Sequence, residues 1–500
     1  MKLNNKKNTA TKAIGAAMLA SLFVLFIVAG CNKKFLDVPP QGQQPGEQFW
    51  QSEADATKAV NAMYANLHEW KQVAFAPIAI ESMGSDDAEK GSSPSDATFM
   101  NNFDNFSASS TEGQILDFWT GQYQEINFCN QVLDNIPAIS MDEGLKSRYI
   151  AEAKFLRAYA YFRLVRAFGD VPLRLNLPVD ASEYNIPRTP KADVYIAIEQ
   201  DLTDAASVLP QTYGSADLGR ATKGAALALH AKVAMYQQHW QDVFDLTSQV
   251  MGSGIYSLFP DYEKLFRVEN ENCSESVFEI QCKYVSGNCD ISNSQYSQVQ
   301  GVRGSTGGGW GFNVPTQDLA NAYEAGDPRR DATIIFRGEL TPEGDAIPVS
   351  GDNPMYNQKS YVPFSTYVDC NEGSDQNVRV IRYAEVLLMN AESANELGNS
   401  AQALSSLNAV RTRARGDDNS ETVLPDITST DQNTLRTIIW HERRVEMAME
   451  FDRFFDLVRT GQAPAVLGPR GFVTGKNEVW PIPQNEIDIS AGTLVQNPGY

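Results

Sequence analysis

One stretch of the chain limits its possible folds more than any other. From Leu145 to Phe168, apolar residues occupy nearly every face of the helix that the pattern predicts. They include Ala153, Phe155, Leu156, Tyr159, Ala160, Phe162 and Leu164. A helix that is apolar around most of its circumference is stable only where other helices cover it. The sequence therefore predicts a mainly α fold with this helix in its interior.

Apolar residues at helical spacing predict further helices on both sides of this one. Ser52 begins a capping box, and Thr189 with Pro190 reads as an N-cap followed by proline at the first helical position. These helices are expected over residues 53–70, 190–209, 222–236 and 240–251.

Residues 383–397 and 401–414 are expected to form two helices joined by the tight turn Gly398-Asn399, with alanines where the helices must approach closely. A unit of this kind, about 34 residues long, cannot bury its own apolar face, so such units stack in arrays. The predicted fold class is thus mainly α. We expect a tetratricopeptide-like scaffold of helical pairs with a large irregular, loop-rich ligand-binding portion.

Helical periodicity fails in two segments. Residues 83–110 contain Ser85-Asp86-Asp87 and several phenylalanines, and residues 286–311 are rich in Gly, Ser, Asn and Gln. The second segment belongs to a longer irregular portion, residues 256–378. Long irregular segments on a rigid scaffold commonly carry binding residues, so we expect the ligand site there.

The N-terminus indicates export and lipid attachment. Four lysines within residues 2–12 precede an uncharged stretch, residues 13–30, that ends in Val28-Ala29-Gly30 before Cys31. This pattern is typical of a lipoprotein signal peptide over residues 1–30, with Cys31 as the acylated first residue of the mature chain. Acyl chains bury enough CH₂ groups to hold a soluble domain on a membrane. The alternative is an uncleaved transmembrane helix, since the apolar stretch is just long enough to span.

The composition argues against several classes of function. Asp and Glu total 62 against 41 Lys and Arg, and the formal net charge of −21 disfavours nucleic-acid partners. The four histidines stand singly, and H-E-x-x-H, G-x-S-x-G and Walker-type motifs are absent from the sequence. We therefore expect no enzyme, no cofactor and no bound metal. A calcium site at Asp86, Asp87 and Asp96 is the weaker alternative.

The cysteines suggest no disulfide framework. Beyond Cys31 they number five, an odd count without a C-x-x-C pair. Buried free thiols are therefore expected. The alternative is a bridge between Cys282 and Cys289 across a short loop in an oxidising compartment.

Several motifs, in order along the chain, can be compared with known families. Residues 34–37 (KFLD) follow Cys31, and residues 153–162 (AKFLRAYAYF) run on to 168–172 (FGDVP). Residues 407–411 (LNAVR), 442–446 (ERRVE) and 453–459 (RFFDLVR) follow, and the chain ends with 480–486 (WPIPQNE) and 496–500 (QNPGY). Together these motifs resemble the SusD/RagB family over essentially the whole mature chain.

The resemblance implies one SusD-like domain over residues 31–500. Its helical scaffold would occupy about 50–255 and 380–460, its irregular insert about 256–378, and an extended C-terminal tail 461–500. It also implies a lipid-anchored protein of the outer membrane, facing the cell exterior, that binds glycan and delivers it to a SusC-like TonB-dependent transporter. Two alternatives of the same architecture remain, namely capture of peptides and a scaffold that binds no small ligand.

Candidate glycan contacts lie in the two irregular segments. Pyranose rings pack their C–H faces on aromatic rings, and their hydroxyls need fixed donors and acceptors. Trp310 is the leading candidate, because a large aromatic residue among the glycines of residues 307–311 has little core to join. It could instead fold back onto the protein. Further candidates, each of which could brace its loop instead, are Tyr296, Arg303, Asp87 and Asn102.

Three glutamates near the C-terminus need an explanation. Glu442, Glu446 and Glu450 recur at four-residue intervals, which would place three like charges on one helix face. We expect cations opposite them inside the helical core, supplied by arginines such as Arg157 or Arg411. A carboxylate pair for glycoside hydrolysis is the weaker alternative, because such a pair must flank a sugar in a cleft.

Overall fold

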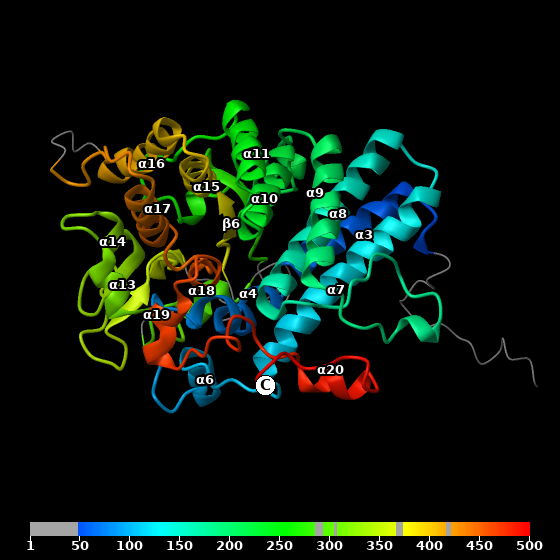
Figure 1. The fold of residues 1–500 in the computed structure, drawn as a ribbon, viewed down its shortest axis with the longest axis horizontal. Coiled ribbons are helices and arrows are strands. Elements are labelled where there is room, and N and C mark those ends of the chain that lie inside the picture. The colour runs from blue at the N-terminus through cyan, green and yellow to red at the C-terminus, as the bar shows by residue number, and fades with distance from the viewer. Residues whose placement is uncertain (1–48, 286–293, 305–307, 367–373, 417–421) are drawn as a thin grey trace, which may run out of the picture.

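The structure, a computed structural model, describes residues 49–285, 294–304, 308–366, 374–416 and 422–500. Its long helices lie beside one another in a row (Figure 1), and neighbours in the row contact each other from α3, α7 and α8 through α9, α10 and α11 to α15, α16 and α17. They are α3 (Glu53–Asn66), α7 (Gly113–Asn135), α8 (Glu143–Phe168), α9 (Lys191–Val208), α10 (Lys223–Tyr236), α11 (Trp240–Gly252), α15 (Tyr383–Glu396), α16 (Ser400–Arg415) and α17 (Gln432–Glu446). The predicted mainly α architecture is confirmed.

Helix α8 lies in the interior, as its sequence predicts. Its N-cap Asp142 accepts a hydrogen bond of 2.8 Å from the backbone N–H of Leu145, and the helix ends at Gly169, whose φ is +73°. Helices α7 and α9 pack on it from two sides, and Phe155 and Phe162 are buried there.

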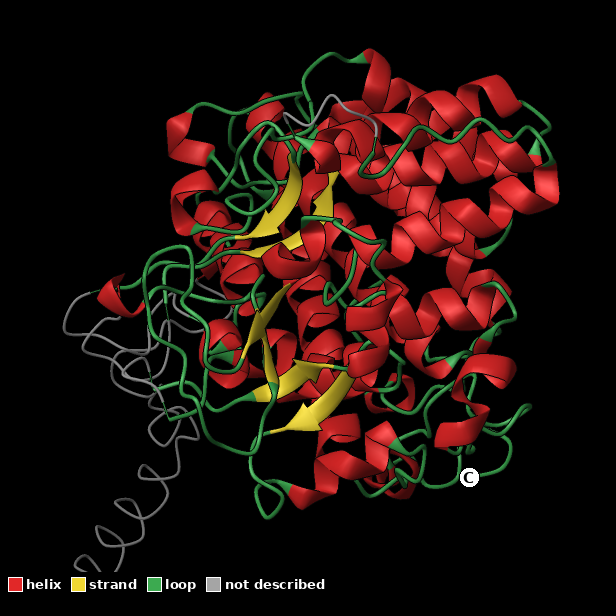
Figure 2. Ribbon diagram, turned by 90° about the vertical axis from the view of Figure 1, so that its left-hand side faces the viewer, coloured by secondary structure: helices red, strands yellow, loops and turns green. Residues whose placement is uncertain are grey.

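The other side of the molecule is built from short elements (Figure 2). Three antiparallel two-stranded sheets pair β1 (Ala88–Gly91) with β3 (Phe312–Pro315), β2 (Ser276–Ile280) with β6 (Val378–Arg382), and β4 (Ile334–Phe336) with β5 (Met355–Asn357). The short helices are α4 (Trp70–Val73), α5 (Phe75–Pro77), the π-helix η2 (Ile78–Met83), α6 (Asn101–Asp104), α12 (Tyr296–Gln300), α13 (Gln317–Ala322), α14 (Arg329–Thr333), α18 (Arg453–Arg459), α19 (Ala463–Leu467) and α20 (Gln484–Ile489).

Two predicted helix boundaries are wrong. The first helix ends at Asn66 instead of near residue 70, and Trp70 begins a separate helix that crosses α7 where Gly121 leaves room for Lys71. Pro190 is the N-cap and not the first helical residue, because its ψ of 136° is extended. Asp170 accepts the N–H of Lys191 at 2.8 Å and so caps this helix from a distant loop.

The C-terminal segment joins the two sides of the molecule. The tail expected to be extended over residues 461–500 contains the helices α19 and α20. Trp480 is 1% exposed, and its indole N–H donates to the carbonyl of Ile80 at 3.0 Å. Asn497 donates to the carbonyls of Phe168 and Trp480. The end of α8 is thus tied to the short helices that precede β1.

Arginines do surround the three glutamates, and Arg411 is one of them. Its guanidinium lies 2.7 Å from Glu442, which also contacts Arg329 at 2.5 Å. Arg157 was the wrong partner, because it pairs with Asp201 on α9 at 2.8 Å. The three carboxylates also do not share one helix, since α17 ends at Glu446.

Glu446 has the strongest positive surroundings of the three. Burial alone would raise its pKa, but Arg413, Arg382 and Arg329 outweigh that effect and hold the pKa well below its usual range. Glu450 pairs with Arg382 at 2.8 Å and with Lys359 at 2.7 Å. All three carboxylates are engaged by cations inside the protein, so they are structural in this fold.

Candidate functional site

Three aromatic side chains from distant parts of the sequence meet on the loop-rich side. The ring centroids of Trp70 and Trp310 are 6.1 Å apart, and Phe75 lies 5.2 Å from Trp70 and 6.0 Å from Trp310. All three rings are partly buried and pack against the edge of the main core, Phe75 also on Phe312 of β3 at 4.8 Å. We call Trp70, Phe75 and Trp310 the aromatic cluster.

The loop that carries Trp310 is held by its backbone. The N–H of Trp310 donates to the carbonyl of Gln298 at 2.9 Å, and the carbonyl of Gly311 accepts from Ser92 at 2.6 Å. Gly309 lies so close to Gly301 that a Cβ atom on it would stand 2.2 Å from the Gly301 carbonyl carbon. Only glycine fits this approach. The indole is therefore presented by a braced loop.

Charged groups border the aromatic cluster. Arg303 pairs with Asp96 at 2.9 Å, and each side chain is 40% exposed. The same guanidinium donates to the hydroxyl of Ser92 at 2.8 Å and to the carbonyl of Trp310 at 3.2 Å. On the α7 side, Lys71 pairs with Asp117 at 3.2 Å. Partly exposed rings bordered by fixed donors and acceptors are suited to a ligand with apolar faces and polar edges.

The structure brings two of the five candidate contact residues together, Trp310 and Arg303. Tyr296 lies on α12, where its ring is 7% exposed and packs 6.1 Å from Phe451. Asp87 is 2% exposed and pairs with Arg444 at 2.8 Å. Burial raises the pKa of Asp87, although Arg444 opposes that effect. Asn102 donates to Glu112, the N-cap residue of α7, at 2.6 Å.

Sequence reasoning missed Trp70 and Phe75. Trp70 stood at the end of a predicted helix, where an aromatic residue reads as core. The signal that could have found them is Pro77, since proline is favoured in the first turn of a new helix and marks a break in the preceding one.

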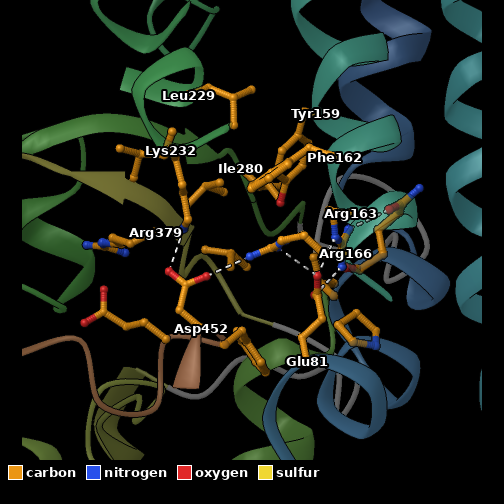
Figure 3. Close-up of a pocket in the computed structure, with 18 of the residues that line it drawn as sticks. Glu81, Tyr159, Phe162, Arg163, Arg166, Leu229, Lys232, Ile280, Arg379 and Asp452 are labelled. Carbon is orange, nitrogen blue, oxygen red and sulfur yellow. Dashed lines mark hydrogen bonds and ion pairs between the residues drawn. The ribbon is translucent and has the colours of Figure 1, made fainter. Parts of the chain in front are cut away.

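A cavity lined by charged side chains lies elsewhere, between α8, α10 and the segment after α17 (Figure 3). Arg163 pairs with Glu81 at 2.7 Å, and Asp452 lies between Arg166 at 2.9 Å and Lys232 at 2.5 Å. The cavity measures about 50 Å³. Sites for small molecules measure ~300 Å³ or more, so this cavity is a buried ion network and not a place for a sugar.

The sequence offers a calcium site at Asp86, Asp87 and Asp96 and a bridge between Cys282 and Cys289 as alternatives. Asp86 pairs with Arg453 at 2.7 Å, and within the described ranges no group of three metal-binding side chains occurs. Cys282 is buried, with its thiol 3.4 Å from the hydroxyl of Ser294. Cys31 and Cys289 lie outside the described residues, so lipidation and the 282–289 bridge stay predictions. In the part of the chain that the structure describes, no helix has the length and apolarity to cross a membrane.

Comparisons with known proteins agree with this architecture. A model described as "SusD family" matches residues 274–477, and one described as "Starch-binding associating with outer membrane" matches residues 34–235. The chain is 30% identical to SusD-like protein P2 of Formosa agariphila, over 96% of this chain and 98% of that protein. It is 28% identical to a SusD-like protein of Bacteroides ovatus, over 88% of this chain and 81% of that one.

Solved structures extend the similarity to three dimensions. A laminarin binding SusD-like protein is 31% identical, with a TM-score of 0.78 over 90% of this chain and 100% of that one. Surface glycan-binding protein A from Bacteroides fluxus is 26% identical, with a TM-score of 0.76 over 90% of this chain and 100% of that one. Similar in sequence and fold along nearly its whole length to these proteins, the chain belongs to the SusD family.

Proposed function

We propose that this protein captures glycans at the cell surface without cleaving them, and that the aromatic cluster is its sugar platform. The observation that carries the proposal is the meeting of Trp70, Phe75 and Trp310 on the loop-rich side, with partly exposed rings. A sugar ring packs its C–H face on such indoles, while the Arg303–Asp96 pair at the border offers a donor and an acceptor to its hydroxyls.

Delivery completes the proposed role. The chain is anchored through acylated Cys31 in the outer membrane, faces the exterior, and passes its glycan to a SusC-like TonB-dependent transporter. The lysine-rich start, the uncharged stretch and the small residues before Cys31 support the anchor. The family model that matches residues 34–235 is described as "Starch-binding associating with outer membrane", which supports this location.

Laminarin is the first ligand to test. The laminarin binding relative is 31% identical over its entire length, which supports a similar glycan here. The experiment is electrophoresis of residues 32–500 through gels that contain laminarin or one of a panel of neutral and anionic polysaccharides. We expect retardation by a neutral polysaccharide, with affinity lowered about tenfold or more in Trp310→Ala, because the platform loses one of its two indole rings.

The matched control is Trp240→Ala. Trp240 is also a partly buried tryptophan at the edge of the core, but it lies at the start of α11. The Trp240→Ala variant should be retarded as strongly as the unmodified protein. Equal retardation of Trp310→Ala and the unmodified protein would remove the aromatic cluster from the site, and no retardation by any polysaccharide would refute glycan capture.

A further inference from the structure

A second cleft opens beside α7, apart from the aromatic cluster. It measures about 430 Å³ and lies between α7, the loop of residues 172–186, and α20 with the residues that follow it. Tyr123 and Tyr184 line it, together with the amide side chains of Gln124, Asn127 and Asn185. This volume falls within the range of about 300–1,000 Å³ found for small-molecule sites.

Hydrogen bonds from α7 and α8 hold the loop of residues 172–186, which forms one wall of the cleft. The Tyr123 hydroxyl donates to the carbonyl of Pro172 at 2.7 Å, and that of Tyr161 donates to the carbonyl of Arg174 at 2.9 Å. Arg174 in turn donates to the carbonyls of Glu183 and Tyr184. The Tyr184 side chain takes no part in these bonds and is 61% exposed. A fixed backbone thus presents an aromatic ring at the mouth of the cleft.

Glu486 supplies a carboxylate inside the cleft. Burial raises the pKa of this carboxyl, although a hydrogen bond from Trp119 opposes the rise. Among the described residues no Lys, Arg or His forms an ion pair with it, which sets it apart from Glu81, Glu442 and Glu446. A carboxylate outside any ion pair, placed beside aromatic rings and amides, can accept hydrogen bonds from the hydroxyls of a bound sugar.

One residue of the cleft contacts the short helix that carries Trp70. Thr120 lines it, and its hydroxyl accepts a hydrogen bond of 3.0 Å from Lys71, the residue after Trp70. One polar contact across α7 therefore separates the two places. A chain of sugars could lie on the cluster with one end and enter the cleft with the other.

We infer that this cleft is a second glycan subsite, in which Tyr184 and Tyr123 pack against a sugar ring and Glu486 accepts hydrogen bonds from its hydroxyls. The inference rests on the proposed function, since the same polymer would occupy both places. Two linked contacts raise the overall affinity beyond that of either alone, because the second binds at a high effective concentration. Long oligosaccharides should therefore bind more tightly than short ones.

The test is calorimetric titration of an oligosaccharide series of increasing length, prepared from the polysaccharide that retards the protein. In Tyr184→Ala, short members should bind as before, whereas affinity for long members should fall about five- to tenfold. Glu486→Gln keeps the size of the side chain and should give a smaller loss of the same kind. The control is Leu340→Ala, which removes an apolar side chain of 68% exposure from the loop between β4 and β5.

The outcomes separate this inference from the proposed function. Equal affinities of Tyr184→Ala and the unmodified protein for every member would overturn the second subsite and leave the aromatic cluster in place. Absence of binding by the unmodified protein would overturn both. Unchanged sugar affinity with lost co-purification of a membrane transporter in Tyr184→Ala would assign the cleft to a protein partner and likewise overturn the inference.

Discussion

Glu125 gives a direct test of how the helical scaffold pays for burying a carboxyl group. It lies on α7, is 1% exposed, and receives hydrogen bonds from Asn66 at 2.8 Å and from the thiol of Cys129 at 3.6 Å. Within the described residues no Lys or Arg forms an ion pair with Glu125, whereas Glu442 pairs with Arg411. Burial raises its pKa from 4.5 to about 8, although both hydrogen bonds oppose the rise.

The sign of the pH effect follows from this shift. Between pH 4.5 and about 8 the folded protein keeps a proton on Glu125 that the unfolded chain has lost. The free energy of unfolding therefore falls as the pH rises through that window and levels off above it. At ~1.36 kcal/mol for each pH unit, the cost at pH 7 is about 3 kcal/mol.

Glu125→Gln removes this titration while it keeps the shape of the protonated side chain. Urea unfolding of both proteins at pH 5 and at pH 8 measures the effect. The variant should gain about 3–4 kcal/mol relative to the unmodified protein between those two pH values. Glu143→Gln, whose side chain is 80% exposed, is the control and should gain about 0.5 kcal/mol or less. A stability difference that stays constant with pH would refute the reasoning.

Two further variants test the ion core and the Trp310 loop. Arg382→Met leaves Glu446 and Glu450 short of a cation and should lower the free energy of unfolding by about 3–5 kcal/mol, whereas Arg330→Met, in an exposed pair with Asp331, should cost about 0.5 kcal/mol or less. Equal losses in urea unfolding would contradict this account. Gly309→Ala must push the loop away from Gly301 and should weaken glycan retardation about as much as Trp310→Ala, while Gly252→Ala, with open space around it, should not. Unaltered retardation of Gly309→Ala would show that the close contact does not position the indole.

The helical scaffold was predictable because its signal is local. Apolar residues over 145–168 report burial on every side, and the pair expected at 383–397 and 401–414 agrees with α15 and α16 to within a residue. The errors have tertiary causes. Helix α4 starts at Trp70 because it crosses α7 at Gly121, and the cap of α9 comes from Asp170, a residue before the helix that no local pattern connects to it.

The candidate site was predictable only in part. Trp310 stood out because glycines surround it, but its partners Trp70 and Phe75 lie more than two hundred residues away in the sequence. Asp87 looked like a loop carboxylate until Arg444, from the other end of the chain, was placed beside it. Tyr296 turns inward because the whole of α12 is buried, and its ring packs on Phe451. Contacts of such long range leave no mark on local composition.

The distribution of charge favours neutral glycans over anionic ones. The chain has a formal net charge of −21. Several of its arginines lie in the interior, and the largest fully buried side chains include Arg329, Arg382, Arg411 and Arg443. Because each buried arginine faces carboxylates, the surface keeps the excess of acidic groups. The acidic surface would repel a sulfated or uronate-rich polymer, whereas it would not repel a neutral polymer. The anionic members of the gel panel should therefore fail to retard the protein, and retardation by one of them would place a basic surface where the described residues show paired charges.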